Sequence, residues 1–253
     1  MSLSFAIISD IHGNLEALTA VLEDIDRRGI KNIVCLGDIV GYGPNPVECV
    51  DLGRSRCKFT ICGNHDEALI KGPWGFNQLA RDAIEYHQKL MRPRFYRLGS
   101  GSRWKFIEGL PLTHEWEGYL FVHGSPRDPT SEYVLPQQVA WPPPGMFEEI
   151  FAAFSKVCFV GHTHVPGIFC EGPSFVPESE LNGPFRYEGE KMLINVGSVG
   201  QPRDRNWRAC YISHQDDQFE YHRLEYPIEE TQRKIRAIDD LDDKLGDRLA
   251  EGE

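Results

Sequence analysis

The sequence predicts a fold in which strands and helices alternate, and two observations carry this prediction. In the first part of the chain, short apolar runs rich in β-branched residues lead into polar clusters and then into helix-like segments. That order is typical of parallel β-α-β units. In the second part, strand-like runs at residues 192–196, 209–213 and 219–223 follow one another closely, and the last two read as a hairpin. We therefore expect a mixed α/β domain with an antiparallel portion.

The first unit has the clearest pattern. Residues 5–8 form an apolar run, and the helix that follows carries leucine, valine and isoleucine at three- and four-residue spacing. Asn14 is a suitable N-cap, and Gly29 is expected to end the helix. Further apolar runs at residues 33–36 and 59–62 predict the next two strands. Polar residues at the carboxyl ends of such strands should converge on one edge of the sheet, where ligands bind in open α/β folds.

Residues 67–110 interrupt this pattern. Their spacing of apolar residues predicts one helix that ends before Pro93, followed by a stretch rich in arginine, glycine and serine. This segment either covers the site as a partial lid or packs on the flank of the sheet. Beyond it, residues 119–122 and 157–160 predict two more strands, and residues 146–154 predict a helix after a proline-rich loop.

The end of the chain and its overall organisation complete the fold prediction. Residues 227–253 are expected to be helical, acidic and frayed at the end. No linker or domain boundary is visible, so we expect one domain over residues 1–253. The sequence does not predict the oligomeric state.

Composition limits the kinds of partner. The 253 residues carry a net charge of −11, so no basic stripe is available to neutralise a nucleic-acid backbone. No apolar run reaches the ~18 residues that a membrane span requires. Neither a basic segment nor a cleavage site flanks the run at residues 3–9, and we expect a cytoplasmic protein. The seven cysteines form no C-x-x-C pair, and we expect buried, reduced thiols.

Five polar clusters stand at the ends of predicted strands. Each alone is more often an ordinary polar turn, but five in such positions are hard to explain as turns. Residues two apart on a strand point to one face, so the paired ligands of the first and last clusters are expected to converge. Carboxylate, amide and imidazole groups together suit a site for two divalent ions. The clusters are Asp10-x-His12, Gly37-Asp38, Gly63-Asn64-His65-Asp66, His123-Gly124 and Gly161-His162-Thr163-His164.

In this order the clusters resemble the calcineurin-like metallophosphoesterase superfamily, whose pattern is D-x-H, G-D, G-N-H-D/E, H and G-H-x-H. All five elements are present between residues 10 and 164. Residues 37–44 and 195–203 are similar to the small bacterial and archaeal phosphodiesterase branch related to diadenosine tetraphosphatases. The resemblance implies a four-layer α/β/β/α sandwich of two mixed β-sheets flanked by helices.

The resemblance also implies a role for each matched residue. The chemistry would be hydrolysis of a phosphate ester of a small, nucleotide-like substrate by metal-activated water. Manganese is the expected metal, with iron, zinc, cobalt or nickel as alternatives. His65 would protonate the leaving group, and Asp66 would orient His65 and raise its pKa. The first ion would take Asp10, His12 and His164, the second would take Asn64, His123 and His162, and Asp38 would bridge both.

Residues outside the metal-ligand pattern have weaker assignments, and most of them have two interpretations. Tyr42, Arg127 and Arg203 are candidate substrate contacts; packing is the alternative for Tyr42, and surface ion pairs are the alternative for the arginines. The four histidines outside the motifs, His87, His114, His214 and His222, are interpreted as structural. Four aromatic residues either stack on a nucleobase or pack in the core: Phe76, Tyr86, Trp104 and Trp116.

Three alternative functions remain open. A serine/threonine protein phosphatase would keep the chemistry, but the residues that follow Asp66 lack the arginine typical of that branch. A nuclease is disfavoured by the acidic charge balance. A non-catalytic scaffold of the same fold would have lost ligands, whereas all seven ligands and His65 are present here.

Overall fold

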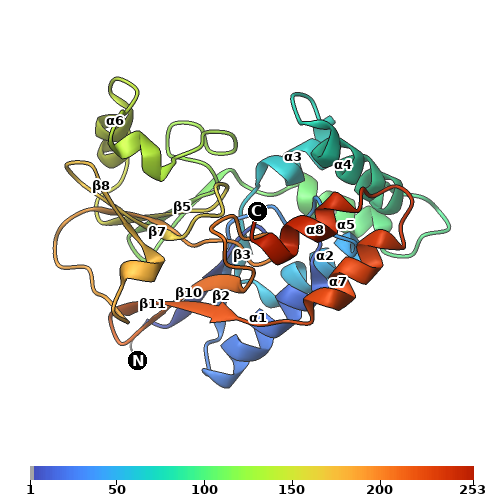
Figure 1. The fold of residues 1–253 in the computed structure, drawn as a ribbon, viewed down its shortest axis with the longest axis horizontal. Helices are drawn as coiled ribbons and strands as arrows, with labels where there is room; N and C mark the ends of the chain where they lie inside the picture. Colours follow the sequence, from blue (N-terminus) through green and yellow to red (C-terminus); the bar gives the residue numbers. More distant parts are fainter. Residues whose placement is uncertain (1–2) are drawn as a thin grey trace.

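The computed structural model describes residues 3–253 and contains two mixed β-sheets (Figure 1). In the first sheet the strand order is β11-β10-β1-β2-β3. Strands β1, β2 and β3 are parallel, and β10 pairs antiparallel with β1 and β11. The bounds are β1 Phe5–Ile8, β2 Asn32–Cys35, β3 Phe59–Thr60, β10 Ala209–Gln215 and β11 Gln218–Leu224.

The second sheet has the order β4-β5-β6-β9-β7-β8. Its central strands β5, β6 and β9 are parallel, while β4, β7 and β8 pair antiparallel with their neighbours. The bounds are β4 Thr113–Trp116, β5 Tyr119–Val122, β6 Val157–Val160, β7 Gly167–Cys170, β8 Ser174–Pro177 and β9 Met192–Asn195. The expected hairpin at the end of the chain is β10–β11.

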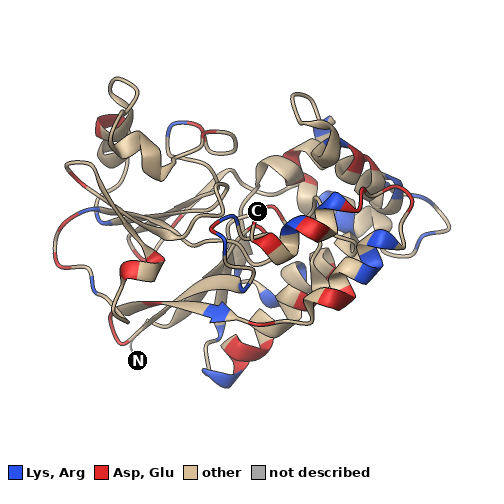
Figure 2. Ribbon diagram, viewed as in Figure 1, with Lys and Arg blue, Asp and Glu red and all other residues tan. Residues whose placement is uncertain are grey.

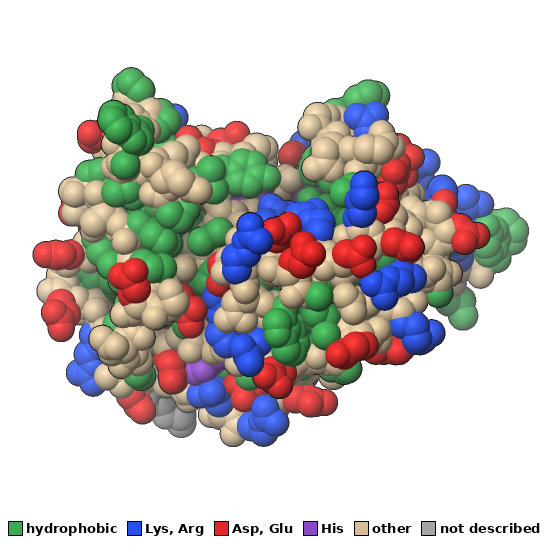
Figure 3. All heavy atoms as spheres, viewed as in Figure 1, with side chains coloured by type: hydrophobic (Ala, Val, Ile, Leu, Met, Phe, Trp, Pro, Cys, Tyr) green, Lys and Arg blue, Asp and Glu red, His purple; other side chains and the backbone are tan. Residues whose placement is uncertain are grey.

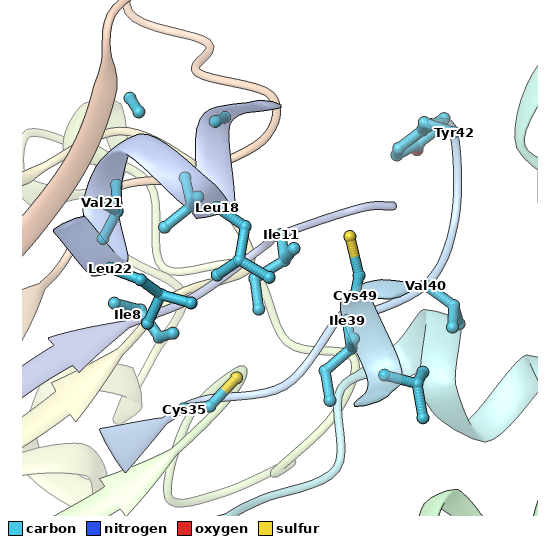
Figure 4. Packing of buried hydrophobic residues seen from close by; sticks show 14 of the residues in the cluster. Ile8, Ile11, Leu18, Val21, Leu22, Cys35, Ile39, Val40, Tyr42 and Cys49 are labelled. Atoms are coloured by element: carbon cyan, nitrogen blue, oxygen red, sulfur yellow. The ribbon is translucent and has the colours of Figure 1, made fainter. Parts of the chain in front are cut away.

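Three hydrophobic clusters define the layers. Phe5 and Ile7 of β1 meet Phe121 of β5 and Phe159 of β6 between the two sheets. The other face of the first sheet packs on helices, and Figure 4 shows side chains of α1 gathered against Ile8. The outer face of the second sheet packs on α6. The structure is therefore the four-layer α/β/β/α sandwich that we expected.

Eight α-helices occur in residues 3–253. Helix α1 begins after Asn14, whose side chain accepts the Ala17 N–H, and Gly29 follows its end with a φ of +73°, as the sequence predicts. Charged residues of both signs are interleaved along α1, α7 and α8 (Figure 2). The bounds are α1 Leu15–Arg27, α2 Pro46–Arg56, α3 Asn64–Lys71, α4 Gln78–Met91, α5 Ser100–Glu108, α6 Met146–Ala152, α7 Ile228–Arg236 and α8 Lys244–Glu251, and two 3₁₀ helices span Pro136–Val139 and Glu178–Glu180.

The C-terminal segment differs from its prediction. Its end is not frayed, because Leu245 and Leu249 of α8 are buried in the helical core. The Gly252 carbonyl also accepts the N–H of Arg205, 3.0 Å away, which ties the end of the chain to the loop before β10. Composition alone misses this docking because the buried residues are few among many charged ones.

The 67–110 region is more helical than predicted. Helix α4 is the expected one, but α5 occupies part of the stretch that the sequence marked as irregular. Helices α3, α4 and α5 pack on one another, and α2 packs on α4 and α5. A lid function for this region stays a prediction. None of the helices in residues 3–253 is long and apolar enough to cross a membrane.

Candidate metal centre

The candidate ligands come from five loops, each of which follows a strand. Asp10 and His12 follow β1, Asp38 follows β2, and Asn64 opens α3 after β3. In the other sheet, His123 follows β5, and His162 and His164 follow β6. Because β1 to β3 are parallel, and so are β5 and β6, these ends meet at one edge of the sandwich.

The backbone brings the ligands together by a route that the sequence argument missed. We expected strand alternation to align the paired ligands, but β1 ends at Ile8 and β6 ends at Val160, so the ligands lie outside the strands. Instead, these ligands adopt the left-handed conformation that non-glycine residues rarely take. Their φ values are +53° at Asp10, +49° at His12, +51° at Asp38, +63° at His162 and +62° at His164.

Backbone hydrogen bonds hold these loops in place. The His12 N–H donates to the carbonyl of Asp38 at 2.9 Å, and the Gly200 N–H donates to the carbonyl of Asp10 at 2.9 Å. The hydroxyl of Ser198 also donates to the Asp10 carbonyl. The loop after β9, which contains residues 196–203, therefore supports the first ligand pair, Asp10 and His12.

The first ligand cluster is buried and consists of Asp10, His12 and His164. Nε2 of His164 lies 3.1 Å from Oδ1 of Asp10 and 3.2 Å from Nε2 of His12. Oδ1 of Asp10 has no hydrogen-bond partner in the described part of the chain. A buried carboxylate oxygen without a partner is costly unless a cation binds it.

The tautomers of the two histidines strengthen this conclusion. Nδ1 of His12 donates to the Val40 carbonyl at 3.0 Å, and Nδ1 of His164 donates to the Gln201 carbonyl. Burial lowers the pKa of both histidines, so both are neutral near pH 7. Each Nε2 then carries a lone pair, and the two lone pairs face each other. This arrangement fits a metal ion between them.

The second cluster contains Asp38, His123 and His162, with Asn64 beside them. Nδ1 of His123 donates to the Leu36 carbonyl at 2.9 Å, and its Nε2 lies 3.1 Å from Oδ1 of Asn64. Burial opposes the charge of His123, but the Asp38 carboxylate outweighs it and raises the pKa of His123 to about 9. The position therefore favours a cation.

In His162 the two ring nitrogens have exchanged roles relative to the other ligand histidines. Its Nε2 donates to the Ser131 carbonyl at 3.2 Å, which leaves Nδ1 free to bind a metal ion. The imidazole also packs on the ring of Tyr133, with the ring centres 3.9 Å apart.

Asp38 stands between the clusters. Its Oδ2 lies 3.4 Å from Nε2 of His123 and 3.7 Å from Nε2 of His12. Its Oδ1 accepts the backbone N–H of His65 at 2.8 Å. Burial favours protonation, but the surrounding histidines hold the pKa of Asp38 well below its usual range. A single ionised oxygen thus faces both clusters.

His65 lies beside the centre but lacks the partner that we expected. The structure groups it with His12 and Asp38, and its Nδ1 is buried without a hydrogen-bond partner in residues 3–253. A Cβ on Gly41 would come within 2.2 Å of this Nδ1, so only glycine leaves room for the ring. Burial lowers the pKa of His65 to about 4.

Asp66 anchors the backbone instead of orienting His65. Its Oδ1 accepts the N–H groups of Ile39 and Val40, and its Oδ2 accepts the N–H of Gly63. The expected contact between Asp66 and His65, and the expected rise in the pKa of His65, were therefore wrong. The carboxylate lies between the loop after β2, which supplies two of its backbone donors, and the start of α3, which supplies the third.

Of the three candidate substrate contacts, two lie beside the metal centre and one does not. Tyr42 packs on the imidazoles of His12 and His65, with ring centres 4.7 and 4.6 Å apart. The guanidinium of Arg203 lies over the Tyr42 ring. Arg127 pairs with two carboxylates, those of Glu132 at 3.4 Å and Glu149 at 3.2 Å, which matches its alternative interpretation.

His87 holds the loop that carries Tyr42, a role that the sequence did not specify. The Gly41 N–H donates to Nδ1 of His87 at 2.9 Å, and Nε2 of His87 donates to the Gly43 carbonyl at 2.8 Å. Both partners are backbone groups, so no side-chain pattern marks the contact. The same reason hides the carbonyls that orient the ligand histidines.

A cavity of about 470 Å³ opens beside the second cluster. It is lined by Asn64, His65 and His162, whereas the residues of the first cluster do not line it. The space-filling view shows the molecule hollowed between two protrusions at the top, on either side of this region (Figure 3). The cavity also has four aromatic walls, Tyr42, Trp74, Phe76 and Tyr133.

Of the four aromatic residues singled out from the sequence, one lines the cavity and three pack in the core. Phe76 lines the cavity, and its ring lies 4.9 Å from that of His65. Tyr86 and Trp104 pack against the helical core, and Trp116 packs between the sheets. Sequence analysis missed Trp74, whose side chain is 83% exposed at the cavity rim.

Comparison with known proteins places this centre in a family. The family model for calcineurin-like phosphoesterases matches residues 3–166, which include all the candidate ligands. The chain belongs to this family. It is therefore a metal-dependent phosphoester hydrolase, and its Asp and His clusters can bind metal.

Similar proteins match over most or all of the chain. The uncharacterized protein MJ0912 of Methanocaldococcus jannaschii is 39% identical, and the match covers 96% of each chain. A metallophosphoesterase from Sphaerobacter thermophilus is 36% identical, covers 100% of both chains and has a TM-score of 0.84. A candidate diadenosine tetraphosphatase shares the fold at 13% identity and a TM-score of 0.51, over 88% of this chain and 94% of that one.

Proposed function

We propose that the chain binds two divalent metal ions and hydrolyses phosphate esters of small, nucleotide-like substrates. One observation carries the proposal: Asp38 stands between the two ligand clusters, with its Oδ2 3.7 Å from Nε2 of His12 and 3.4 Å from Nε2 of His123, and the second cluster opens into a cavity of substrate size. The cavity falls within the range of small-molecule sites.

The donor sets fit two ions. Asp10, His12 and His164 would hold the first, and Asn64, His123 and His162 would hold the second, with Asp38 shared. Two bound divalent ions supply a hydroxide at neutral pH and neutralise charge on the phosphoryl oxygens. We propose manganese for both positions, with iron, zinc, cobalt or nickel as alternatives, because Asp, Asn and His ligands suit all of these metals.

His65 is the proposed proton donor to the leaving group. It lines the cavity and has an unpartnered ring nitrogen. A bound phosphate would add negative charge near the imidazole, which favours its protonated form and raises its pKa. Asp66 contributes indirectly, since it fixes the loop after β2 and the start of α3.

The aromatic walls favour a substrate with a flat group. Trp74, Phe76 and Tyr133 line the cavity, and aromatic side chains stack well on nucleobases. This arrangement supports a small substrate over a phosphoprotein or a nucleic-acid end. The cytoplasmic location and the absence of nucleic-acid and membrane partners stay predictions.

A hydrolysis screen tests this proposal. We expect metal-dependent cleavage of chromogenic phosphate monoesters or diesters, measured with each candidate metal in turn. Trp74→Ala should weaken binding of nucleotides more than that of p-nitrophenyl phosphate, whereas Trp141→Ala, another exposed tryptophan outside the cavity, should weaken neither. Absence of metal-dependent cleavage with every metal would contradict the proposal.

A further inference from the structure

Two arginines from distant parts of the chain converge on Tyr42. Arg203 lies in the loop between β9 and β10, and Arg248 lies on α8. Their guanidinium carbons lie 5.8 and 5.9 Å from the centre of the Tyr42 ring. The same ring contacts His12 and His65. The arginine pair therefore stands one side chain away from the candidate metal centre.

Neither guanidinium has a carboxylate within ion-pair distance in the described part of the chain. Nη2 of Arg203 contacts uncharged oxygens, the Tyr42 hydroxyl at 3.4 Å and Oε1 of Gln201 at 3.3 Å, and its Nε is buried without a partner. Other arginines of this region each bind a carboxylate: Arg205 binds Glu253, Arg208 binds Glu225 and Arg223 binds Glu178.

The positive charges of the two arginines repel each other. Arg248 is half-buried, and both burial and the nearby charge of Arg203 lower its pKa. Partly buried like charges cost free energy unless an anion accompanies them. A guanidinium presents a planar fork of donors that matches a phosphoryl group. The pair thus has the charge and the donors of an anion site.

The fold positions Arg248 through two separate contacts. Leu245 and Leu249 anchor α8 in the helical core. The Gly252 carbonyl then binds the N–H of Arg205, two residues after Arg203. Figure 1 shows the C-terminus beside the loops at the middle of this face, and Figure 3 shows Lys and Arg side chains there, interspersed with Asp and Glu. Helix α8 therefore holds Arg248 against the ring of Tyr42, beside the loop that carries Arg203.

We propose that Arg203 and Arg248 bind a second phosphoryl group of the substrate, next to the one that is hydrolysed. This inference rests on the proposed function, which places the scissile phosphate at the metal centre. It narrows the substrate class to esters that carry a chain of at least two phosphates. A monophosphate would occupy the metal centre without engaging Arg248.

Calorimetric binding of two probes that the enzyme cannot hydrolyse tests the subsite. Inorganic phosphate carries one phosphoryl group, and methylenebisphosphonate carries two. Binding to the Mn²⁺-loaded protein is measured at constant free Mn²⁺, since the bisphosphonate chelates the metal. We expect Arg248→Gln to weaken bisphosphonate binding by about 10- to 100-fold, the range for charge-assisted hydrogen bonds, and phosphate binding by much less.

Two further variants make the test specific. Arg208→Gln removes the same charge from an arginine that already has a partner, and it should leave the ratio of the two affinities as in the wild type. Arg248→Lys keeps the charge but loses the planar fork, so its loss should be intermediate. If circular dichroism shows that Arg248→Gln does not fold, Arg248→Lys serves as the test variant in its place.

The outcomes separate the two proposals. Equal losses in Arg248→Gln and Arg208→Gln, or a wild type that binds both probes equally well, would show that the subsite is wrong. If chromogenic esters are still hydrolysed in that case, the proposed function stands. If no ester is hydrolysed, the proposed function fails, and the binding ratio still reports on the arginine pair.

Discussion

The two ligand clusters of the metal centre differ in their access to solvent. Asp10, His12 and His164 are buried, and none of them lines the cavity. In the other cluster, Asn64 is partly exposed and lines the cavity together with His162. Ligands that are closed in by backbone should release an ion slowly, and ligands on a cavity wall should exchange ions and meet substrate. Under the proposed function, Asp10, His12 and His164 would therefore anchor one metal ion, and the cluster with Asn64 and His162 would present the other to the substrate.

The largest effect is expected at Asp38, which stands between the two clusters. Asp38→Asn removes the negative charge and should lower metal-dependent hydrolysis by at least ~100-fold, because even partners of metal ligands contribute about 10- to 100-fold. Kinetics and metal analysis measure the effect, and Asp240→Asn, which alters an exposed ion pair with Lys89, is the control. Wild-type activity with two bound ions would contradict the shared role.

Removing one ligand from each cluster tests the difference directly. After brief dialysis against a chelator, the wild-type protein should retain one ion. His162→Ala should also retain it, whereas His12→Ala should lose it, with an affinity lowered by about 10- to 100-fold or more. Measuring the metal content of each protein during dialysis shows which ion is retained. If both ions leave the wild-type protein at one rate, the two clusters do not differ in the way proposed.

His65 tests the chemistry at the boundary between the clusters. His65→Ala should slow hydrolysis of an alkyl or ribose ester by up to ~10²–10⁴-fold, the contribution of positioned proton transfer. A p-nitrophenyl ester should slow little, because that leaving group departs without a proton. Metal content should stay unchanged. Equal losses on both esters, or loss of an ion, would show that His65 has a different role.

The smallest effect is expected at His87, which holds the loop that carries Tyr42. Its contribution to folding stability depends on pH. Burial lowers the pKa of His87 from 6.5 to about 4. As pH falls from 6.5 towards 4, the unfolded chain takes up a proton here and the folded protein does not. Folding stability is therefore full above pH 6.5 and declines below it, by up to about 3 kcal/mol at ~1.4 kcal/mol per pKa unit.

His87→Gln isolates this contribution. A glutamine amide offers one donor for the Gly43 carbonyl and one acceptor for the Gly41 N–H, and it does not titrate. Denaturant unfolding at pH 7 and pH 4.5 should show a smaller acid loss of stability in the variant, by about 2–3 kcal/mol. A loss of the same size as in the wild type would assign the acid sensitivity to other groups.

Sequence patterns predicted most strands and their order along the chain. Short apolar runs end where polar clusters begin, and β1, β2, β5 and β6 all follow this rule. The predictions from sequence patterns failed where local composition and tertiary packing favour different structures. Helix α5 starts in a glycine- and serine-rich stretch, and α8, half of whose residues are charged, is held by only a few buried residues such as Leu245 and Leu249. In both places, contacts with distant residues outweigh local preference.

The sequence by itself determined which residue types stand at the strand ends, and hence the candidate ligands, because those positions are local in the chain. Only the tertiary structure decided how they meet. The left-handed backbone at Asp10 and His12, the carbonyls that orient the imidazoles, and the approach of Arg203 and Arg248 to Tyr42 all depend on segments far apart in the chain. Backbone partners carry no sequence signature, since every residue offers the same carbonyl and amide.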